Sequence, residues 1–343
     1  MALTLTNLGL VVLTLIAAAA SWSAILQLRG AIAGRVGPGP DADAVGGERS
    51  DDQPKIAAVS RIQGPWLGGA SLVLAGGSAA LLALRIARHA GDGWSPLTAH
   101  VDGLLLIAML LAALGWFIQR RPKLAGMAAF YLPLLTLILA WAVCASAWTY
   151  RPFGVDTLHP VWQAVHLTGV YLGTLGSGVA AVAGAMYLYV ERQFKAKTNP
   201  TALMRIASLE RLERLIIQSA TLGFALLTLG LVSGVVILWD RRDLPAGWWA
   251  SPKVLLATAA WAVYAVVMNV RTATVFRGRR AAWLAIGGLV LLLGVYGVVT
   301  GGGGAFQKPT PPDGSPQAPP PPAEVGPTLG LGHPQLHRRG DRP

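Results

Sequence analysis

Histidine and tryptophan are the side chains of this chain best suited to hold a ligand, and they gather in the same segments. Six of the twelve tryptophans lie in residues 85–101, 148–162 and 239–253, namely Trp94, Trp148, Trp162, Trp239, Trp248 and Trp249. The histidines are His89, His100, His159, His166, His333 and His337, and the first four lie in or just after these segments. Imidazole nitrogen binds transition metals, and indole rings cover flat apolar surfaces. Together they predict a flat, conjugated, metal-bearing ligand.

Haem is a ligand of this kind, because its iron takes a histidine nitrogen axially and its ring packs against apolar and aromatic surface. The segment "WDRRDLPAGWWASPK" (239–253), here called the Trp loop, also offers Arg241, Arg242 and Lys253 to the haem propionates. The alternative for each tryptophan is the aromatic belt of a membrane interface. That belt does not explain why histidines lie in the same segments.

Other chemistry finds little support in the sequence. It contains no Ser/His/Asp set, no paired carboxylates and no closed metal-ligand spacing. The single cysteine, Cys144, excludes an intramolecular disulfide and a CxxC redox pair. The glycine-dense stretches 68–77 and 169–178 lack the strand, turn and lysine of a phosphate-binding loop. We therefore expect a binding protein rather than an enzyme, and we interpret both stretches as sites of close helix packing.

The elements that must position these residues are membrane-spanning helices. Hydrophobic residues make up 53% of the chain and charged residues only 13%, whereas soluble domains carry about 25% charged residues. About 20 apolar residues cross a bilayer as a helix, in which every backbone amide is paired. Eight runs have roughly this length: 4–28, 66–84, 102–119, 124–147, 163–190, 215–238, 254–270 and 281–301. They predict an all-α polytopic integral membrane protein of about eight transmembrane helices.

The distribution of basic residues predicts the orientation of these helices. Segments 29–65, 120–123, 191–214 and 271–280 hold 18 Lys and Arg, whereas segments 85–101, 148–162 and 239–253 hold 6. Basic loops stay in the cytoplasm, so both termini and the Trp loop are expected outside. The net charge of +12 then reflects topology and not nucleic-acid binding. Because no Lys or Arg precedes the first run, we interpret it as a retained helix and not a signal peptide.

Three segments stand apart from the apolar runs. Residues 29–64 are polar and read as a flexible cytoplasmic loop within the membrane domain 1–301. Residues 302–343 are rich in Pro and Gly and are expected to form a disordered tail. Residues 200–218 show an amphipathic pattern, which predicts a helix along the cytoplasmic surface that runs into the sixth span.

Several stretches resemble the cytochrome c assembly protein family, whose members are multi-helix membrane proteins that handle haem during maturation of c-type cytochromes. They are "ASLERLERLIIQSATLGFALLTLGLVSG" (207–234), "WWASPK" at the end of the Trp loop, "WAVYA" (261–265), "RGRRAAWLAIGG" (277–288) and "LHPVWQAVHLTGVYLG" (158–173). The resemblance covers about 158–301, and residues 1–157 are similar only in hydropathy.

The resemblance implies roles for individual residues. His166 falls at the position of the family's outer-face histidine, an axial haem ligand and therefore the metal-binding residue. The other positions that match the family pattern are Trp248 on the haem platform, Pro252 and Lys253 in the "PK" of that platform, and Trp261 and Tyr264 in the next helix. We add Trp249 and Trp239 of the same loop, and His100 or His159 as a second iron ligand.

This chain also departs from the family pattern. Ser251 replaces the platform aspartate, Ala250 its second tryptophan and Val254 the following glutamate. Asn269 stands where a membrane histidine is common, and the second outer histidine has no counterpart in "GVVTGGGG". These departures put bis-histidine ligation in doubt and favour the divergent HemX-like and YpjD-like members.

The expected function is a haem-handling or accessory role in cytochrome c biogenesis, with haem presented at the outer Trp loop. The expected location is the bacterial inner (cytoplasmic) membrane. The expected partners are haem, other cytochrome c maturation membrane proteins and the lipid bilayer. The alternative is a regulator or scaffold in haem metabolism that does not itself bind haem. A small-molecule transporter is disfavoured, because no broken helix with convergent charge marks a midplane site.

The orientation is directly testable with reporter fusions. Fusions after residues 122, 200 and 275 should report the cytoplasm, and those after residues 155 and 245 the outside, because of the Lys and Arg asymmetry. Alkaline phosphatase and green fluorescent protein activities measure the two sides. The reversed pattern would place the Trp loop in the cytoplasm and contradict an outer haem surface.

Overall fold

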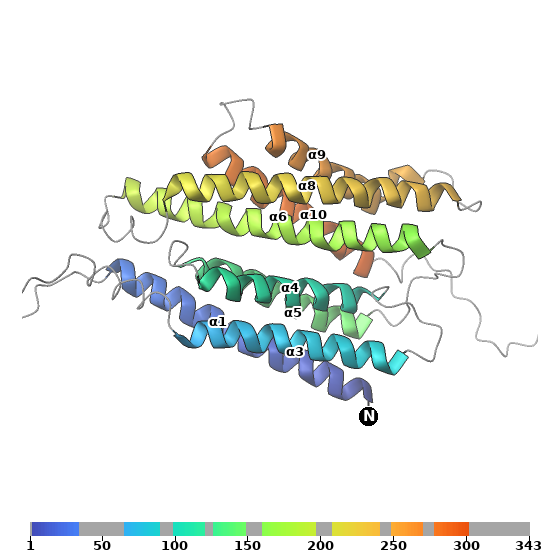
Figure 1. The fold of residues 1–343 in the computed structure, drawn as a ribbon, viewed down its shortest axis with the longest axis horizontal. Helices are drawn as coiled ribbons and strands as arrows, with labels where there is room; N and C mark the ends of the chain where they lie inside the picture. Colours follow the sequence, from blue (N-terminus) through green and yellow to red (C-terminus); the bar gives the residue numbers. More distant parts are fainter. Residues whose placement is uncertain are drawn as a thin grey trace, which may run out of the picture. The chain divides into compact units, whose positions relative to one another are not determined.

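The computed structural model describes residues 2–33, 65–89, 99–120, 126–148, 160–196, 208–240, 248–269 and 278–301. These residues form eight α-helices and one short 3-10 helix, with no strand among them (Figure 1). The elements are α1 (Ala2–Ala33), α3 (Pro65–His89), α4 (His100–Gln119), α5 (Ala128–Trp148), α6 (Pro160–Lys195), α8 (Leu209–Asp240), η2 (Trp248–Ala250), α9 (Pro252–Asn269) and α10 (Arg279–Gly301). The prediction of an all-α protein with about eight helices is confirmed.

The helices have the length and composition of membrane spans. Seven of those described are long and apolar enough to cross a bilayer, and the shorter α9 carries an apolar stretch over Val254–Met268. Leucine, valine and tryptophan side chains lie exposed along several of these helices, as lipid-facing residues do. The chain is therefore a multi-pass membrane protein.

Two predicted boundaries differ from the structure. α1 continues to Ala33, so the start of the segment expected as a loop, 29–64, is helical. α3 continues to His89, so Arg85 belongs to a helix and not to the connection 85–101. The rest of 29–64, the tail 302–343, His159, Arg241 and Arg242 lie outside the described residues.

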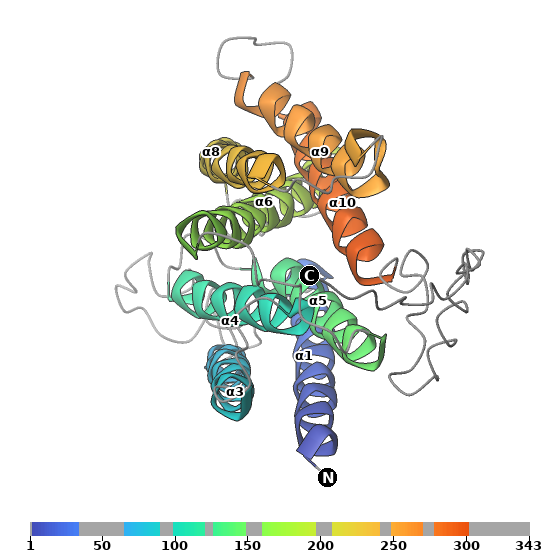
Figure 2. The ribbon, with the colours of Figure 1, turned by 90° about the vertical axis from the view of Figure 1, so that its right-hand side faces the viewer.

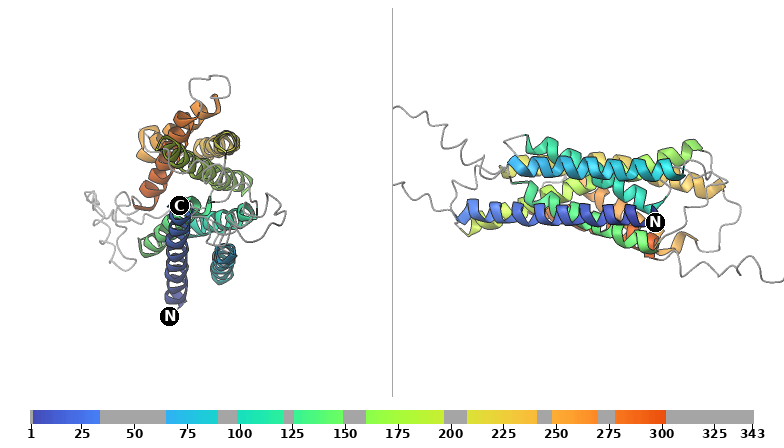
Figure 3. Two further views of the ribbon diagram at one scale, coloured as in Figure 1. Left: turned by 90° about the vertical axis from the view of Figure 1, so that its left-hand side faces the viewer. Right: turned by 90° about the horizontal axis from the view of Figure 1, so that it is seen from below.

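The helices pack in two groups of four (Figures 1 and 2). One group contains α1, α3, α4 and α5, and the other contains α6, α8, α9 and α10; both can also be followed in Figure 3. α6 connects the groups, because it contacts α4 and α5 as well as α8 and α10. Successive helices run in opposite directions (Figure 1), so the starts of α4, α6 and α9 share one end with the ends of α3, α5 and α8. We call it the outer end, because the distribution of Lys and Arg predicts that this end faces outside.

α6 and α8 approach so closely that their backbones touch. A Cβ atom added at Gly169 would lie 2.7 Å from the backbone nitrogen of Gly230, and one at Gly176 would lie 3.0 Å from the Cα atom of Gly223. Real Cβ atoms essentially never show the first distance, and the second is tighter than nine in ten real Cβ contacts. Small residues drive association in lipid because they allow such contact. We call this contact the glycine seam; it consists of Gly169, Gly173 and Gly176 of α6 and Gly223, Leu227 and Gly230 of α8. The expectation of close packing over 169–178 is confirmed.

Two polar contacts join the helices of the first group. Arg85 of α3 donates from Nε to Asp102 Oδ1 of α4 at 2.5 Å, and the Asp102 side chain is completely buried. Ser71 of α3 and Tyr131 of α5 lie 2.6 Å apart, oxygen to oxygen, and Gln119 of α4 donates to both. Charges within membrane helices are costly and therefore lie paired in the interior, which explains why α3 and α4 meet at this ion pair.

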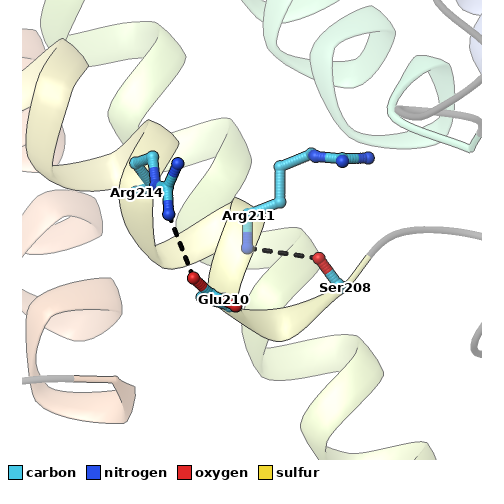
Figure 4. A network of polar contacts seen from close by, with 4 residues as sticks. All are labelled: Ser208, Glu210, Arg211 and Arg214. Atoms are coloured by element: carbon cyan, nitrogen blue, oxygen red, sulfur yellow. Dashed lines mark hydrogen bonds and ion pairs between the residues drawn. The ribbon is translucent and has the colours of Figure 1, made fainter.

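The described part of the amphipathic segment, from residue 209 to 218, forms the first turns of α8 itself. α8 begins at Leu209 and runs without a break to Asp240, so over the described residues it is not a separate surface helix. Ser208 caps its start, because the Ser208 hydroxyl accepts a hydrogen bond from the Arg211 amide at 3.3 Å (Figure 4). Arg214 donates to Glu210 one turn earlier at 3.0 Å (Figure 4). Both of these side chains are exposed, so the pair contributes little to stability.

The buried ion pair predicts a large effect on stability. Asp102→Asn should destabilise the protein by about 3–5 kcal/mol, because it removes the countercharge of the Arg85 guanidinium, whose side chain is only 14% exposed. Glu210→Gln removes an exposed ion pair and should leave stability unchanged. The thermal unfolding midpoint of each variant in detergent measures the difference. Equal midpoints would show that the Arg85–Asp102 pair does not hold α3 to α4.

Candidate haem site at the outer end

His166 lies in the second turn of α6 and makes a defined contact with α8. Its Nδ1 atom lies 2.7 Å from the carbonyl oxygen of Gly230. A carbonyl oxygen can only accept, so Nδ1 carries the proton and donates it. In the neutral ring, Nε2 then carries the lone pair. This is the tautomer that binds a metal through Nε2.

The imidazole also packs against a second glycine of α8. A Cβ atom at Gly234 would lie 3.0 Å from His166 Cε1 and 3.2 Å from His166 Nδ1, tighter than ordinary van der Waals contact. The ring edge formed by these two atoms therefore faces α8. The Gly230 carbonyl also accepts a hydrogen bond from Ser233 Oγ at 3.0 Å. His166 is thus held against α8 by its hydrogen bond to Gly230 and by close packing against Gly234.

A single stripe of α6 connects the glycine seam with the outer end. Its members are Trp162, His166, Gly169, Gly173 and Gly176, spaced by four and three residues, which places them on one helix face. Gly169 and Gly173 are buried, His166 is half-buried and Trp162 is 43% exposed. Burial along this face of α6 therefore decreases toward the outer end, beginning at His166. Trp162 shares this helix face with His166, and its i, i+4 spacing from His166 within "LHPVWQAVHLTGVYLG" already indicates this pairing in the sequence.

The described part of the Trp loop presents its indole rings to the surroundings. Trp239 is 86% exposed at the end of α8, and Trp249 is 65% exposed in η2. Trp248 is half-buried, and its carbonyl accepts a hydrogen bond from the Ser251 amide at 3.1 Å. No hydrogen bond or ring contact among the described residues joins His166 to these three tryptophans. The structure thus places His166 and these tryptophans at the same end of the second helix group, with no hydrogen bond or ring contact between them over the described residues.

Two residues that match the family pattern have structural roles. Trp261 of α9 donates from Nε1 to Thr228 Oγ1 of α8 at 2.9 Å, and its ring lies 5.5 Å from that of Phe224. Tyr264 of α9 is buried and donates to the Ala285 carbonyl of α10 at 3.3 Å. These contacts hold α9, and with it the C-terminal side of the Trp loop, against its neighbours.

The remaining predicted ligands are less well defined by the structure. His100 is the first residue of α4 and is half-buried at the outer end. His159 lies outside the described residues, directly before Pro160, at which α6 begins. Lys253 belongs to α9, whose second residue it is. His100 shares the outer end with His166, because α4 and α6 both begin there.

Other sites compete poorly with His166. A pocket between the two helix groups is lined by apolar residues and by Gly178, Thr174 and Tyr296. It contains no histidine and no charged side chain. Over the helices described here, no group of three or more His, Cys, Asp or Glu side chains could hold a bare metal ion. A haem iron needs no such group, because the porphyrin supplies four of its ligands.

The fold and the site together define a class of protein. It is a multi-pass helical membrane protein with, at one end of the bundle, a histidine whose Nδ1 is bonded to a backbone carbonyl. Residues 97–302 match the family model described as Cytochrome C assembly protein, which covers more than half of the chain. The chain therefore belongs to the cytochrome c assembly protein family. The match begins upstream of residue 158, where the resemblance noted in the sequence starts, and it includes α4 to α10 but neither α1 nor α3.

Curated relatives agree with this family. The chain is 25% identical over 253 residues to the cytochrome c biogenesis protein CcsA of Prochlorococcus marinus (strain MIT 9303), covering 66% of this chain and 79% of the relative. It is 38% identical over 91 residues to the cytochrome c biogenesis protein CcsA of Synechococcus sp. (strain RCC307), covering 26% of this chain and 29% of the relative. No solved structure matches. Family and relatives support a role in cytochrome c biogenesis.

Proposed function

We propose that this protein binds haem at its outer end and presents it during cytochrome c biogenesis, with His166 as the axial ligand. Membership of the cytochrome c assembly family and similarity to CcsA proteins support the process. The bound haem would supply the iron porphyrin that c-type cytochromes carry. The work of the chain is to bind and orient it, and we propose no enzymatic activity.

The hydrogen bond between His166 and Gly230 carries this proposal. Histidines that bind metals usually donate their other ring N–H to a carbonyl or carboxylate, which fixes the tautomer and raises the basicity of the ligand nitrogen. His166 has this arrangement, with Nδ1 bonded to a carbonyl at 2.7 Å and Nε2 not used in that bond. Its half-buried position keeps water away from one side of the ring and leaves the other accessible.

The tryptophans supply the surface for the porphyrin. Trp162 lies one turn outside His166 on the same face of α6, and Trp239 and Trp249 are the most exposed rings of the Trp loop. Flat apolar ligands pack well against such rings. Arg241, Arg242 and Lys253 are the cations nearest in sequence to these rings, and we assign the propionates to them.

We propose that the iron of the bound haem has one strong histidine ligand, His166. Asn269 replaces the family's membrane histidine, and the second outer histidine has no counterpart in this sequence. The sixth position is then left to water, to a weaker side chain or to His100 or His159. Such haem is weakly held and at least partly high-spin. This pattern and the replaced platform residues Ala250 and Ser251 support a place beside the HemX-like members, acting with other maturation proteins in the bacterial inner membrane.

The same replacements support a second candidate function. A scaffold that keeps the fold to hold partner proteins does not need the platform aspartate, which is Ser251 here, or its second tryptophan, which is Ala250. Such a protein would not retain haem. An absorption spectrum therefore separates the two functions.

His166→Ala tests the ligand. Wild-type protein produced with ample haem should show a Soret band at neutral pH, His166→Ala should lose it, and added imidazole should restore part of it. His100→Ala should keep the band but increase its high-spin character if His100 is the second ligand. Optical and electron paramagnetic resonance spectra of the purified proteins measure these outcomes. Wild-type protein without a Soret band would contradict haem binding and favour the scaffold.

The tryptophan surface is tested separately. Trp249→Ala should reduce the haem retained on purification several-fold without unfolding the protein, because its ring is 65% exposed and available to the ligand. Trp22→Ala is a matched control, because Trp22 of α1 is also 65% exposed but lies outside the family region. Haem per protein is measured by the pyridine haemochrome method. Equal losses in the two variants would show that the rings belong to the membrane interface alone.

A further inference from the structure

Gly230 and Gly234 of α8 both contact the His166 ring, and we call these two glycines the His166 seat. Gly230 supplies the carbonyl that binds Nδ1 at 2.7 Å, and Gly234 leaves the space that Cε1 and Nδ1 occupy. We propose that these two glycines are positioning residues for the haem ligand: they select its tautomer and fix the direction of Nε2. This inference rests on the proposed function, because it assigns His166 to haem, but the state of the ring can be measured without haem.

The absence of a side chain at position 234 has a cost in a helix. Glycine is about 1 kcal/mol less favourable than alanine in a helix interior. Gly234 lies inside the regular helix α8, at neither a turn nor a positive φ. The space it leaves is filled by the imidazole, since an added Cβ atom would lie 3.0 Å from Cε1. A methyl group there would therefore push the ring by a few tenths of an ångström and turn Nδ1 away from its acceptor.

Gly230 acts at the backbone. A Cβ atom at this position would lie 3.0 Å from Val170 Cγ2 and 3.2 Å from the Val170 nitrogen. Without it, α8 comes close enough to α6 for its carbonyl to reach a side chain that starts on α6. An N–H···O hydrogen bond is ordinarily no longer than about 3.2 Å, so a helix separation wider by more than about half an ångström would break this 2.7 Å contact. The helix separation set by Gly230 thus decides whether His166 has a partner.

A general packing role for these glycines makes a different prediction. Gly223 lies on the same helix and is equally tight, because an added Cβ atom would lie 3.1 Å from the Ser177 nitrogen and 3.2 Å from the Gly173 carbonyl oxygen. It has no contact with His166 in the seam. If packing alone mattered, alanine at 223 and at 234 would have the same effects. If the seat positions the ligand, only position 234 affects the imidazole.

The first experiment measures the ring itself, in haem-free protein in lipid. Solid-state ¹⁵N spectra of histidine-labelled wild-type protein, with His166 assigned by its loss in His166→Asn, should show a protonated Nδ1 and an unprotonated Nε2. Gly234→Ala should convert this signal to a mixture of tautomers, and Gly223→Ala should leave it unchanged. Wild-type protein with protonated Nε2, or a Gly234→Ala signal identical to the wild type, would overturn the proposal. The wild-type spectrum decides even if a variant fails to fold.

The second experiment measures the consequence for the ligand. Gly234→Ala should weaken haem binding roughly 10- to 100-fold, the range found when partners of metal-binding histidines are lost, and should shift the Soret band. Gly223→Ala should keep the wild-type spectrum even if it lowers the unfolding temperature. Identical spectra of the two variants would overturn the proposal. Wild-type protein that shows the Nδ1–H signal but no Soret band would contradict the proposed function and still support the positioning of the ring.

Discussion

The contact between the backbones of α6 and α8 is the constraint on which the rest of the structure depends. In lipid the hydrophobic effect does not drive helices together, so shape and van der Waals contact must do so. Glycines at 169 and 176 of α6 meet glycines at 230 and 223 of α8. α6 in turn contacts α4, α5 and α10, so the placement of both helix groups relative to α8 follows from this one seam. His166 reaches Gly230 at the outer end of this contact.

The elements of the fold could be predicted from the sequence because each crosses a bilayer. A span needs about 20 apolar residues and tolerates few charges, and this leaves a strong signal in a chain with only 13% charged residues. The signal fails at the helix ends, where polarity no longer separates helix from loop. For this reason the sequence pattern places Arg85 in a connection, whereas Arg85 lies in the last turns of α3 and pairs with Asp102.

The candidate site could be predicted only in part. His166 was identified through its family-like surroundings, but its acceptor lies 64 residues away. Which residue of α8 faces His166 depends on the register of the two helices. Every residue has a backbone carbonyl, so the sequence does not indicate which carbonyl accepts the hydrogen bond. The positions of the tryptophans alone also do not identify the candidate site, because tryptophans lie at both ends of the helices. Trp66 and Trp283 lie exposed in the first turns of α3 and α10, opposite the outer end, as an aromatic belt at both interfaces requires. The pairing of Trp162 with His166 on one helix face is the more specific indication.

α6 and α8 are longer than a bilayer requires. With 36 and 32 residues, they span roughly 54 and 48 Å at about 1.5 Å per residue, against a hydrocarbon core of about 30 Å. The surplus turns carry Lys195, Glu210 and Arg214 at the end opposite His166. The glycine seam fixes the axial register of these two helices, so it also fixes where Gly230 and Gly234 lie beside His166. The charged turns at one end and the imidazole at the other are therefore carried by one continuous pair of helices.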